Sequence, residues 1–173
     1  MLSRKQVEDI ERQAEETLGL TESSNGHPSP ASGMVSLPVD LNAILKSLEL
    51  KSERHILRPA VSGSYKKDAH EIKVNRLDSR SRQAFTIAHE IGHAVLHGDR
   101  PDDTFWRSEA NDPSCALTQE EQQANWFAAS LLMPRKSVEA AWGRVRDLGE
   151  LKDLFGVSAQ AMEYRLKNLR LIA

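Results

Sequence analysis

The amino-acid sequence predicts an α+β domain in which a small sheet packs against several helices. Residues 54–75 contain short runs that alternate apolar and polar side chains, which is typical of half-buried strands. Residues 79–97 and 118–133 instead repeat apolar side chains at helical spacing. A last region, residues 144–173, contains a pair of shorter helical patterns. These three observations predict one small sheet followed by helices.

Length and composition indicate a single globular domain in a reducing compartment. The chain has 173 residues, of which 39% are hydrophobic and 28% charged, so it can bury one core. A formal net charge of −2 gives no general attraction to nucleic acid or to an anionic membrane. The one cysteine, Cys115, excludes an internal disulfide. The first residues lack the apolar run of a secretory signal, and the longest apolar run, residues 127–133, is too short to span a bilayer. We therefore expect a cytoplasmic protein without a membrane segment.

Four segments are expected along the chain. Residues 1–20 form an N-terminal amphipathic helix, and residues 21–36, which are rich in Pro, Ser and Gly, form a flexible linker. Residues 37–143 make the main domain, which opens with a helix that starts near Asp40. Residues 144–173 form a C-terminal helical segment packed on that domain. The opening helix has a clear apolar stripe, formed by Leu41, Ile44, Leu45 and Leu48.

The predicted sheet has three strands. They lie at Ile56–Leu57, at Val61–Tyr65 and around Ile72 and Val74, where polar residues alternate with apolar ones. Residues 66–69 are expected to turn a hairpin between the second strand and the third.

The next element is a helix over about residues 79–97. Asp78 or Ser79 can cap its first turn, and Gly98 is placed to end it in the left-handed conformation. The side of this helix that would face a core carries Ala84, Ala88, Ile91 and Val95.

The motif His89-Glu90-Ile91-Gly92-His93 lies within this helix and indicates a metal site. Side chains at i and i+4 share one face of a helix, so both imidazoles can reach one ion while Glu90 projects beside it. A zinc ion bound by His89 and His93 would activate water, and Glu90 would take its proton. The alternative is that the two histidines bind no metal and only form hydrogen bonds within a core. The apolar back of the helix favours the metal site.

A hydrolytic zinc site has three protein ligands and one open position, so a third ligand is required. The single cysteine excludes a thiolate site. His97 lies a further turn along the same helix, and three ligands over two turns, about 12 Å, cannot contact one ion. The helix over residues 118–133 offers Glu120 and Glu121, and the apolar spacing does not choose between them. Glu121 also has a competing role, since Thr118 and Glu121 form a capping-box pattern.

The segment Leu148–Asn168 provides the main competing interpretation of the chain. It has the helix, glycine-bearing turn and second helix of a DNA-binding helix-turn-helix. A surplus of only two basic residues over residues 144–173 is poor for binding phosphates. We therefore expect the helical pair mainly to pack on the rest of the chain, with direct nucleic-acid binding as the alternative. The basic residues are Arg144, Arg146, Lys152, Arg165, Lys167 and Arg170, and the acidic ones are Asp147, Glu150, Asp153 and Glu163.

These motifs also resemble a known family. The sequence HEIGHAVLHG, preceded by FTIA, and the downstream E-x-Q-A-N-x-F-A-A-x-L-L-M-P are similar to the ImmA/IrrE family of zinc peptidases. The resemblance covers roughly residues 37–172, because Leu37-Pro38-Val39-Asp40-Leu41 and Tyr164-Arg165-Leu166 are also similar. In the family pattern the first acid of E-x-x-A-N is the third zinc ligand, which implies Glu121. One departure is Gln123, where the family often has Glu.

The resemblance implies a zincin-like metallopeptidase core over residues 37–143. Zinc, or manganese in its place, would be held by His89, His93 and Glu121, with Glu90 as the catalytic base. The peptide substrate would lie extended along an exposed strand edge. The implied substrate is a helix-turn-helix repressor, whose cleavage relieves repression in bacteria. An antirepressor that acts by binding, without proteolysis, is the alternative.

Two supporting roles are open at this stage. The candidates for stabilising the oxyanion are Tyr65, His70 and Tyr164. Asn125, one turn from Glu121, would either orient a metal ligand or simply pack between helices.

Overall fold

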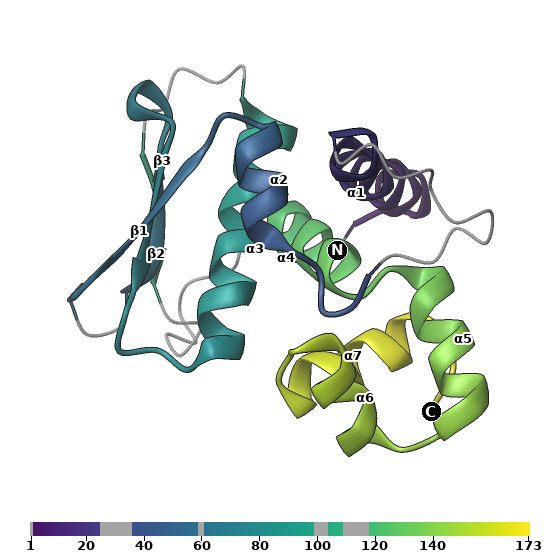
Figure 1. Ribbon diagram of the computed structural model, residues 1–173. Helices are drawn as coiled ribbons and strands as arrows, with labels where there is room; N and C mark the ends of the chain where they lie inside the picture. Colours follow the sequence, from purple (N-terminus) through teal and green to yellow (C-terminus); the bar gives the residue numbers. More distant parts are fainter. Residues whose placement is uncertain (1, 25–35, 59–60, 99–103, 109–117) are drawn as a thin grey trace.

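The computed structural model describes residues 2–24, 36–58, 61–98, 104–108 and 118–173. A sheet with helix α3 packed beside it makes one side of the molecule, and the other helices make the rest (Figure 1). In chain order the elements are α1 (Arg4–Ser24), α2 (Leu41–Ser47), β1 (Lys51–His55), β2 (Val61–Lys66), the 3-10 turn η1 (Lys67–Ala69), β3 (Glu71–Asn75), α3 (Arg80–His97), β4 (Thr104–Ser108), α4 (Gln119–Leu132), α5 (Arg135–Val145), α6 (Leu148–Phe155) and α7 (Ala159–Asn168). The predicted α+β class agrees with this arrangement. None of the described helices combines the length and apolar character needed to cross a membrane.

The sheet has four strands in the order β1-β3-β2-β4, with β1 parallel to β3 and the other pairs antiparallel. The hairpin that was predicted at residues 66–69 is present, since η1 joins β2 to β3. The first strand was placed wrongly. It is Lys51–His55 rather than Ile56–Leu57, and Ile56 is 64% exposed. β1 is a polar edge strand without alternating apolar residues, so its sequence does not indicate a strand. The two aliphatic residues that follow it were therefore predicted as the strand instead. The fourth strand, β4, was not predicted.

Helix α3 begins and ends where the sequence indicates. Ser79 rather than Asp78 is its cap, because the Ser79 hydroxyl accepts a hydrogen bond from the backbone N–H of Arg82 at 3.2 Å. The expected left-handed ending is wrong, since Gly98 has φ −56° and ψ −23°. Glycine serves a close approach here instead: a Cβ at this position would lie 2.7 Å from the carbonyl oxygen of Ala94.

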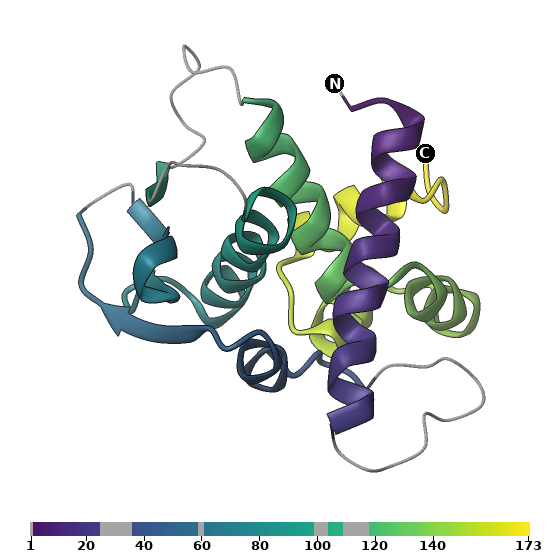
Figure 2. The same cartoon turned by 90° about the horizontal axis from the view of Figure 1, so that it is seen from above.

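Helices α3 and α4 lie side by side and touch closely (Figures 1 and 2). The contact is centred on Gly92, which has no side chain to separate the two backbones. A Cβ there would lie 3.1 Å from Cδ1 of Phe127 and 3.2 Å from Cα of Ala124. Ala124 and Phe127 are both fully buried. The separation of the two helices is therefore set by a glycine on one and an alanine on the other.

Helix α1 is part of the core. It packs along α4 and against α2 (Figure 2), and it buries Ile10, Ala14 and Leu18. The helix runs to Ser24, four residues into the segment that was expected to be linker. Residues 25–35 of that segment lie outside the described part of the chain.

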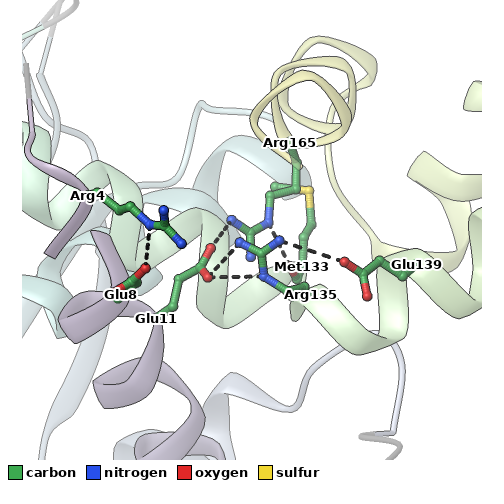
Figure 3. Close-up of polar contacts among 7 residues, drawn as sticks. All are labelled: Arg4, Glu8, Glu11, Met133, Arg135, Glu139 and Arg165. Atoms are coloured by element: carbon green, nitrogen blue, oxygen red, sulfur yellow. Dashed lines mark hydrogen bonds and ion pairs between the residues drawn. The ribbon is translucent and has the colours of Figure 1, made fainter. Parts of the chain in front are cut away.

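A partly buried ionic cluster joins α1 to the C-terminal helices (Figure 3). Glu11 of α1 accepts hydrogen bonds from Arg135 of α5 at 2.9 Å and from Arg165 of α7 at 3.0 Å. Arg165 is 1% exposed, and its Nε donates to the carbonyl oxygen of Met133 at 3.0 Å. Burial lowers the pKa of Arg165, and the Glu11 carboxylate opposes that shift. The apolar side of the C-terminal helices joins the same core, through Leu151, Phe155, Met162 and Leu166.

Candidate metal centre

Two helices bring three side chains together that could bind a metal ion. His89 and His93 lie in the second half of α3 and are fully buried, whereas Glu121 lies in the first turn of α4 and is 22% exposed. The two Nε2 atoms are 3.1 Å apart. Glu121 places Oε2 at 3.3 Å from Nε2 of His89 and Oε1 at 3.3 Å from Nε2 of His93. The three side chains thus converge on one point, and the carboxylate is the side of the site that faces solvent.

The spacing of these atoms, with one carboxylate oxygen beside each imidazole nitrogen, suits a tetrahedral zinc ion. Nitrogen and oxygen ligands bind zinc at about 2.0–2.2 Å, so donors at tetrahedral angles lie about 3.3–3.6 Å apart. The observed separations of 3.1 and 3.3 Å are close to that range without any movement of the helices. Two imidazoles and one carboxylate leave a fourth position open, as hydrolytic sites require. The same nitrogen and oxygen donors also accept manganese.

The carboxylate at this site is Glu121, not Glu120. Thr118 does cap α4, because its hydroxyl accepts the backbone N–H of Glu121 at 3.2 Å. The side chain of Glu121, however, lies against the two imidazoles. Burial raises the pKa of Glu121, but its contacts with His89 and His93 more than offset this, and the net pKa is well below the ordinary value. The capping pattern and the ligand position are thus compatible, since one uses the backbone and the other the side chain.

Asn125 lies one turn after Glu121 and fixes the orientation of the first imidazole. Its Oδ1 is 3.1 Å from Nδ1 of His89. An amide oxygen can only accept, so Nδ1 carries a proton, and Nε2 is the ring nitrogen left to bind a metal. Metal-binding histidines commonly have such an acceptor on the other ring nitrogen. Of the two roles that the sequence left open for Asn125, this geometry favours the orienting one.

Glu90 is fully buried between α3 and β2. Arg82, Thr86 and Glu90 form one stripe of α3, spaced four residues apart, and the stripe faces β2. Arg82 donates from Nε to the hydroxyl of Ser62 at 3.1 Å. A Cβ at Gly63 would collide with Cγ2 of Thr86 and lie 3.7 Å from Oε1 of Glu90. Glycine in β2 therefore lets the strand approach the carboxylate closely, beside a register irregularity of β2 against β4.

The remaining candidates lie in different surroundings. The ring of His97 is 5.5 Å from that of His93, so it borders the site without joining the three ligands. Tyr65 is buried in the core, and burial raises its pKa. Tyr164 is 61% exposed on α7, and His70 ends η1 in the left-handed conformation.

A second group of metal-type side chains lies on the sheet and was not singled out from the sequence. It consists of Glu53, His55 and Glu71. His55 Nε2 contacts Oε2 of Glu53 at 3.0 Å, and Lys73 lies 3.6 Å from Glu71. Lys73 already supplies a positive charge beside this partly exposed group. We interpret it as a surface ion-pair cluster.

Comparison with known proteins agrees with this geometry. Residues 49–167 match the IrrE N-terminal-like domain of the M78 peptidases. The radiation response metalloprotease IrrE of Deinococcus deserti is 37% identical over 109 residues, and that of Deinococcus radiodurans is 35% identical over 111 residues. Each alignment covers 60% of this chain, but only 38% and 33% of the two relatives.

A solved structure shows the same fold over most of the chain. It is a Mycobacterium tuberculosis transcriptional regulator, with a TM-score of 0.59 and 20% sequence identity. The match covers 91% of this chain and 46% of the regulator. The family match includes α3 and α4, which carry the candidate metal ligands, and all four strands of the sheet. The chain therefore belongs to the IrrE N-terminal-like domain family of metallopeptidases.

Proposed function

We propose that the protein is a zinc-dependent endopeptidase. The observation that carries this proposal is the convergence of His89, His93 and Glu121, whose Nε2 atoms lie 3.1 Å apart and each 3.3 Å from one oxygen of the carboxylate. A buried carboxylate, Glu90, stands next to the first histidine. Zinc bound there would polarise the scissile carbonyl and lower the pKa of a water molecule. The membership in a metallopeptidase family supports the same reaction.

Glu90 moves the proton in this reaction. Its carboxylate takes a proton from the attacking water as the new C–O bond forms at the peptide carbonyl. It then delivers that proton to the nitrogen as the C–N bond breaks, so that the products are a carboxylate and an amine. The close approach of β2 at Gly63 excludes bulk water from one side of this carboxylate. Asn125 and Glu121 hold the imidazoles in place meanwhile.

The substrate peptide is proposed to lie extended beside the sheet. β4 is the last strand in the sheet order, and it pairs with β2, the strand that contacts Glu90. A peptide that added to the β4 edge would extend the sheet on the side of β2, one strand beyond it. The main-chain hydrogen bonds of such pairing bind many sequences, so specificity would come from contacts elsewhere.

The proposed substrate protein is a helix-turn-helix repressor, and its cleavage would relieve repression. The resemblance to the ImmA/IrrE family supports this choice, and the likeness to two radiation response metalloproteases supports a role in regulation. The chain spans well under half the length of those relatives.

The alternative is a regulator that binds DNA or repressor without proteolysis. Three observations disfavour phosphate binding by the C-terminal helices. Arg165 is buried against Glu11, Lys152 contacts Asp153 at 2.6 Å, and Lys167 contacts Glu163 at 2.9 Å. Half of the basic residues in this segment thus already have a carboxylate partner. We propose that α6 and α7 serve mainly to pack against α1 and α5.

The variant Glu90→Gln tests the chemistry separately from metal binding. It keeps the size of the side chain but cannot accept a proton, and general-base catalysis typically contributes about 10²- to 10⁴-fold. We expect the variant to hold about one zinc per chain, to bind a co-expressed repressor and to leave it intact while the wild type cuts it. Release of the repressor from DNA without cleavage, by both proteins equally, would instead establish an antirepressor that acts by binding.

A further inference from the structure

One corner of the sheet gathers four arginines and two exposed aliphatic side chains. We call it the arginine corner, and it consists of Arg54, Ile56, Arg58, Arg76, Leu77 and Arg80. β1 and β3 are parallel, so their C-terminal ends lie together, at the lower end of the sheet as drawn in Figure 1. The backbone N–H of Arg76 donates to the carbonyl oxygen of His55 at 2.8 Å, which joins the two strand ends.

Gln83 of α3 holds this corner together. Its Oε1 accepts a hydrogen bond from Nε of Arg54 at 3.0 Å. Its Nε2 donates to the carbonyl oxygen of Asp78 at 2.8 Å. One side chain thus connects β1, the turn after β3 and the start of α3. The backbone of the corner is thereby joined to α3, and the Arg54 side chain is held in place.

The corner is strongly basic in a chain of net charge −2. Residues 54–58 and 76–80 contain four arginines and a single acid, Asp78, for a balance of +3. The four guanidinium groups are exposed, and none of them forms an ion pair with any described residue. Arginines elsewhere, such as Arg4, Arg12 and Arg135, each contact a carboxylate. The corner therefore presents positive charge that the described fold leaves uncompensated.

The aliphatic residues of the corner indicate what kind of partner compensates it. Ile56 is 64% exposed and Leu77 is 70% exposed, the highest values among the exposed large hydrophobic residues described. Protein interfaces are enriched in arginine and bury apolar side chains beside it. A nucleic-acid backbone would engage the guanidinium groups but offers little to two aliphatic side chains, and the negative net charge opposes it.

We propose that the arginine corner is a docking surface for an acidic protein segment that carries interspersed aliphatic side chains. Its carboxylates pair with the guanidinium groups while its aliphatic side chains cover Ile56 and Leu77. Helix α3 begins at Arg80 of the corner. The first candidate metal ligand, His89, lies nine residues further, about 13 Å along the helix. Binding here is thus separate from the metal ligands. It does not depend on whether the metal centre hydrolyses peptides.

The test uses fluorescence anisotropy of the full chain with a labelled peptide of alternating glutamate and leucine. The variant Arg58→Gln/Arg76→Gln/Arg80→Gln removes three charges from the corner and leaves the Arg54 contact with Gln83 intact. A matched control, Lys5→Gln/Lys136→Gln/Arg144→Gln, removes three exposed charges from other elements. A second peptide replaces glutamate by glutamine, and a DNA duplex serves as the alternative polyanion.

We expect the acidic peptide to bind the wild type and the control variant equally, and the corner variant about tenfold more weakly, since exposed charge contacts are individually small. The glutamine peptide should bind poorly. The variant Ile56→Ser/Leu77→Ser should weaken binding even at high salt, where charge contacts are screened. Equal loss in the control variant, or no binding of the acidic peptide, would refute the proposal. Tighter binding of the duplex than of the peptide, lost in the corner variant, would assign the corner to nucleic acid instead.

Discussion

The contact at Gly92 gives a sharp prediction, because it separates metal affinity from stability. In Gly92→Ala the new Cβ would lie 3.1 Å from Cδ1 of Phe127, 3.2 Å from Cα of Ala124 and 3.3 Å from the Ala124 carbonyl oxygen. Carbon atoms in good contact are about 3.5–4.0 Å apart, so α4 must retreat by roughly 0.3–0.5 Å. Two of the three atoms belong to the backbone, which cannot rotate away.

That retreat acts directly on the metal centre. Glu121 lies one turn before Ala124 on the same helix, and its oxygens are 3.3 Å from the imidazoles of α3. We expect zinc affinity to fall by about 10- to 100-fold, as when the support of a metal ligand is disturbed. The stability of the metal-free protein should fall by no more than about 2 kcal/mol. Alanine gains up to about 1 kcal/mol in helix propensity, while overpacking costs about 1–3 kcal/mol.

Competition with a chromogenic chelator measures the zinc affinity, and urea unfolding of the metal-free protein measures its stability. Gly143→Ala is the matched control, since Gly143 lies in helix α5 and has nothing within 4 Å of an added Cβ. This control should bind zinc like the wild type and gain up to about 1 kcal/mol of stability. If Gly92→Ala also binds zinc like the wild type, then the helix separation does not control the site and the reasoning is wrong.

Three further variants test individual contacts. Glu121→Gln should lose most zinc affinity but little thermal stability in the metal-free form, because the capping bond uses its backbone N–H; a loss in Glu120→Gln instead would move the ligand by one residue. Asn125→Ala should weaken zinc binding about 10- to 100-fold, whereas Asn125→Asp, which keeps an acceptor, should retain it; equal loss in both would refute the orienting role. Glu11→Ala should lower the free energy of unfolding in urea by about 3–5 kcal/mol, because the buried guanidinium of Arg165 loses its carboxylate. Arg165→Met should lower it less. A loss below about 1 kcal/mol for Glu11→Ala would contradict this.

The elements that the sequence predicted well are those with local signals. The start of α3 follows from Ser79 and the helical spacing after it, and the hairpin follows from two apolar runs separated by a polar turn. The cap of α2 is equally local, since Asp40 accepts from the backbone N–H of Asn42 and Ala43. In each case a few neighbouring residues determine the structure, so one sequence is enough to find it.

The elements that the sequence missed depend on distant partners. β1 is a mostly exposed strand whose regular structure comes from its ladder with β3, twenty residues away. β4 is a strand because it pairs with β2, although β3 and all of α3 separate the two strands in the sequence. The Glu11 cluster likewise joins residues 124 and 154 positions apart, and nothing near Glu11 distinguishes it from the other acids of α1. Such pairings leave no periodic trace in the local sequence.

The third ligand shows where local reasoning ends within the site itself. The positions of Glu120 and Glu121 differ by about 100° around α4, and each shares a stripe with buried residues, so periodicity alone could not choose. The choice depends on which side of α4 faces the imidazoles, and on how near it comes. Both are set by the contact of Gly92 with Ala124 and Phe127, residues that carry no metal chemistry. The resemblance to the family pattern selected Glu121 as the first acid of E-x-x-A-N, without reference to this packing. Physically, the ligand set of this site is a property of the α3–α4 packing as much as of the three side chains.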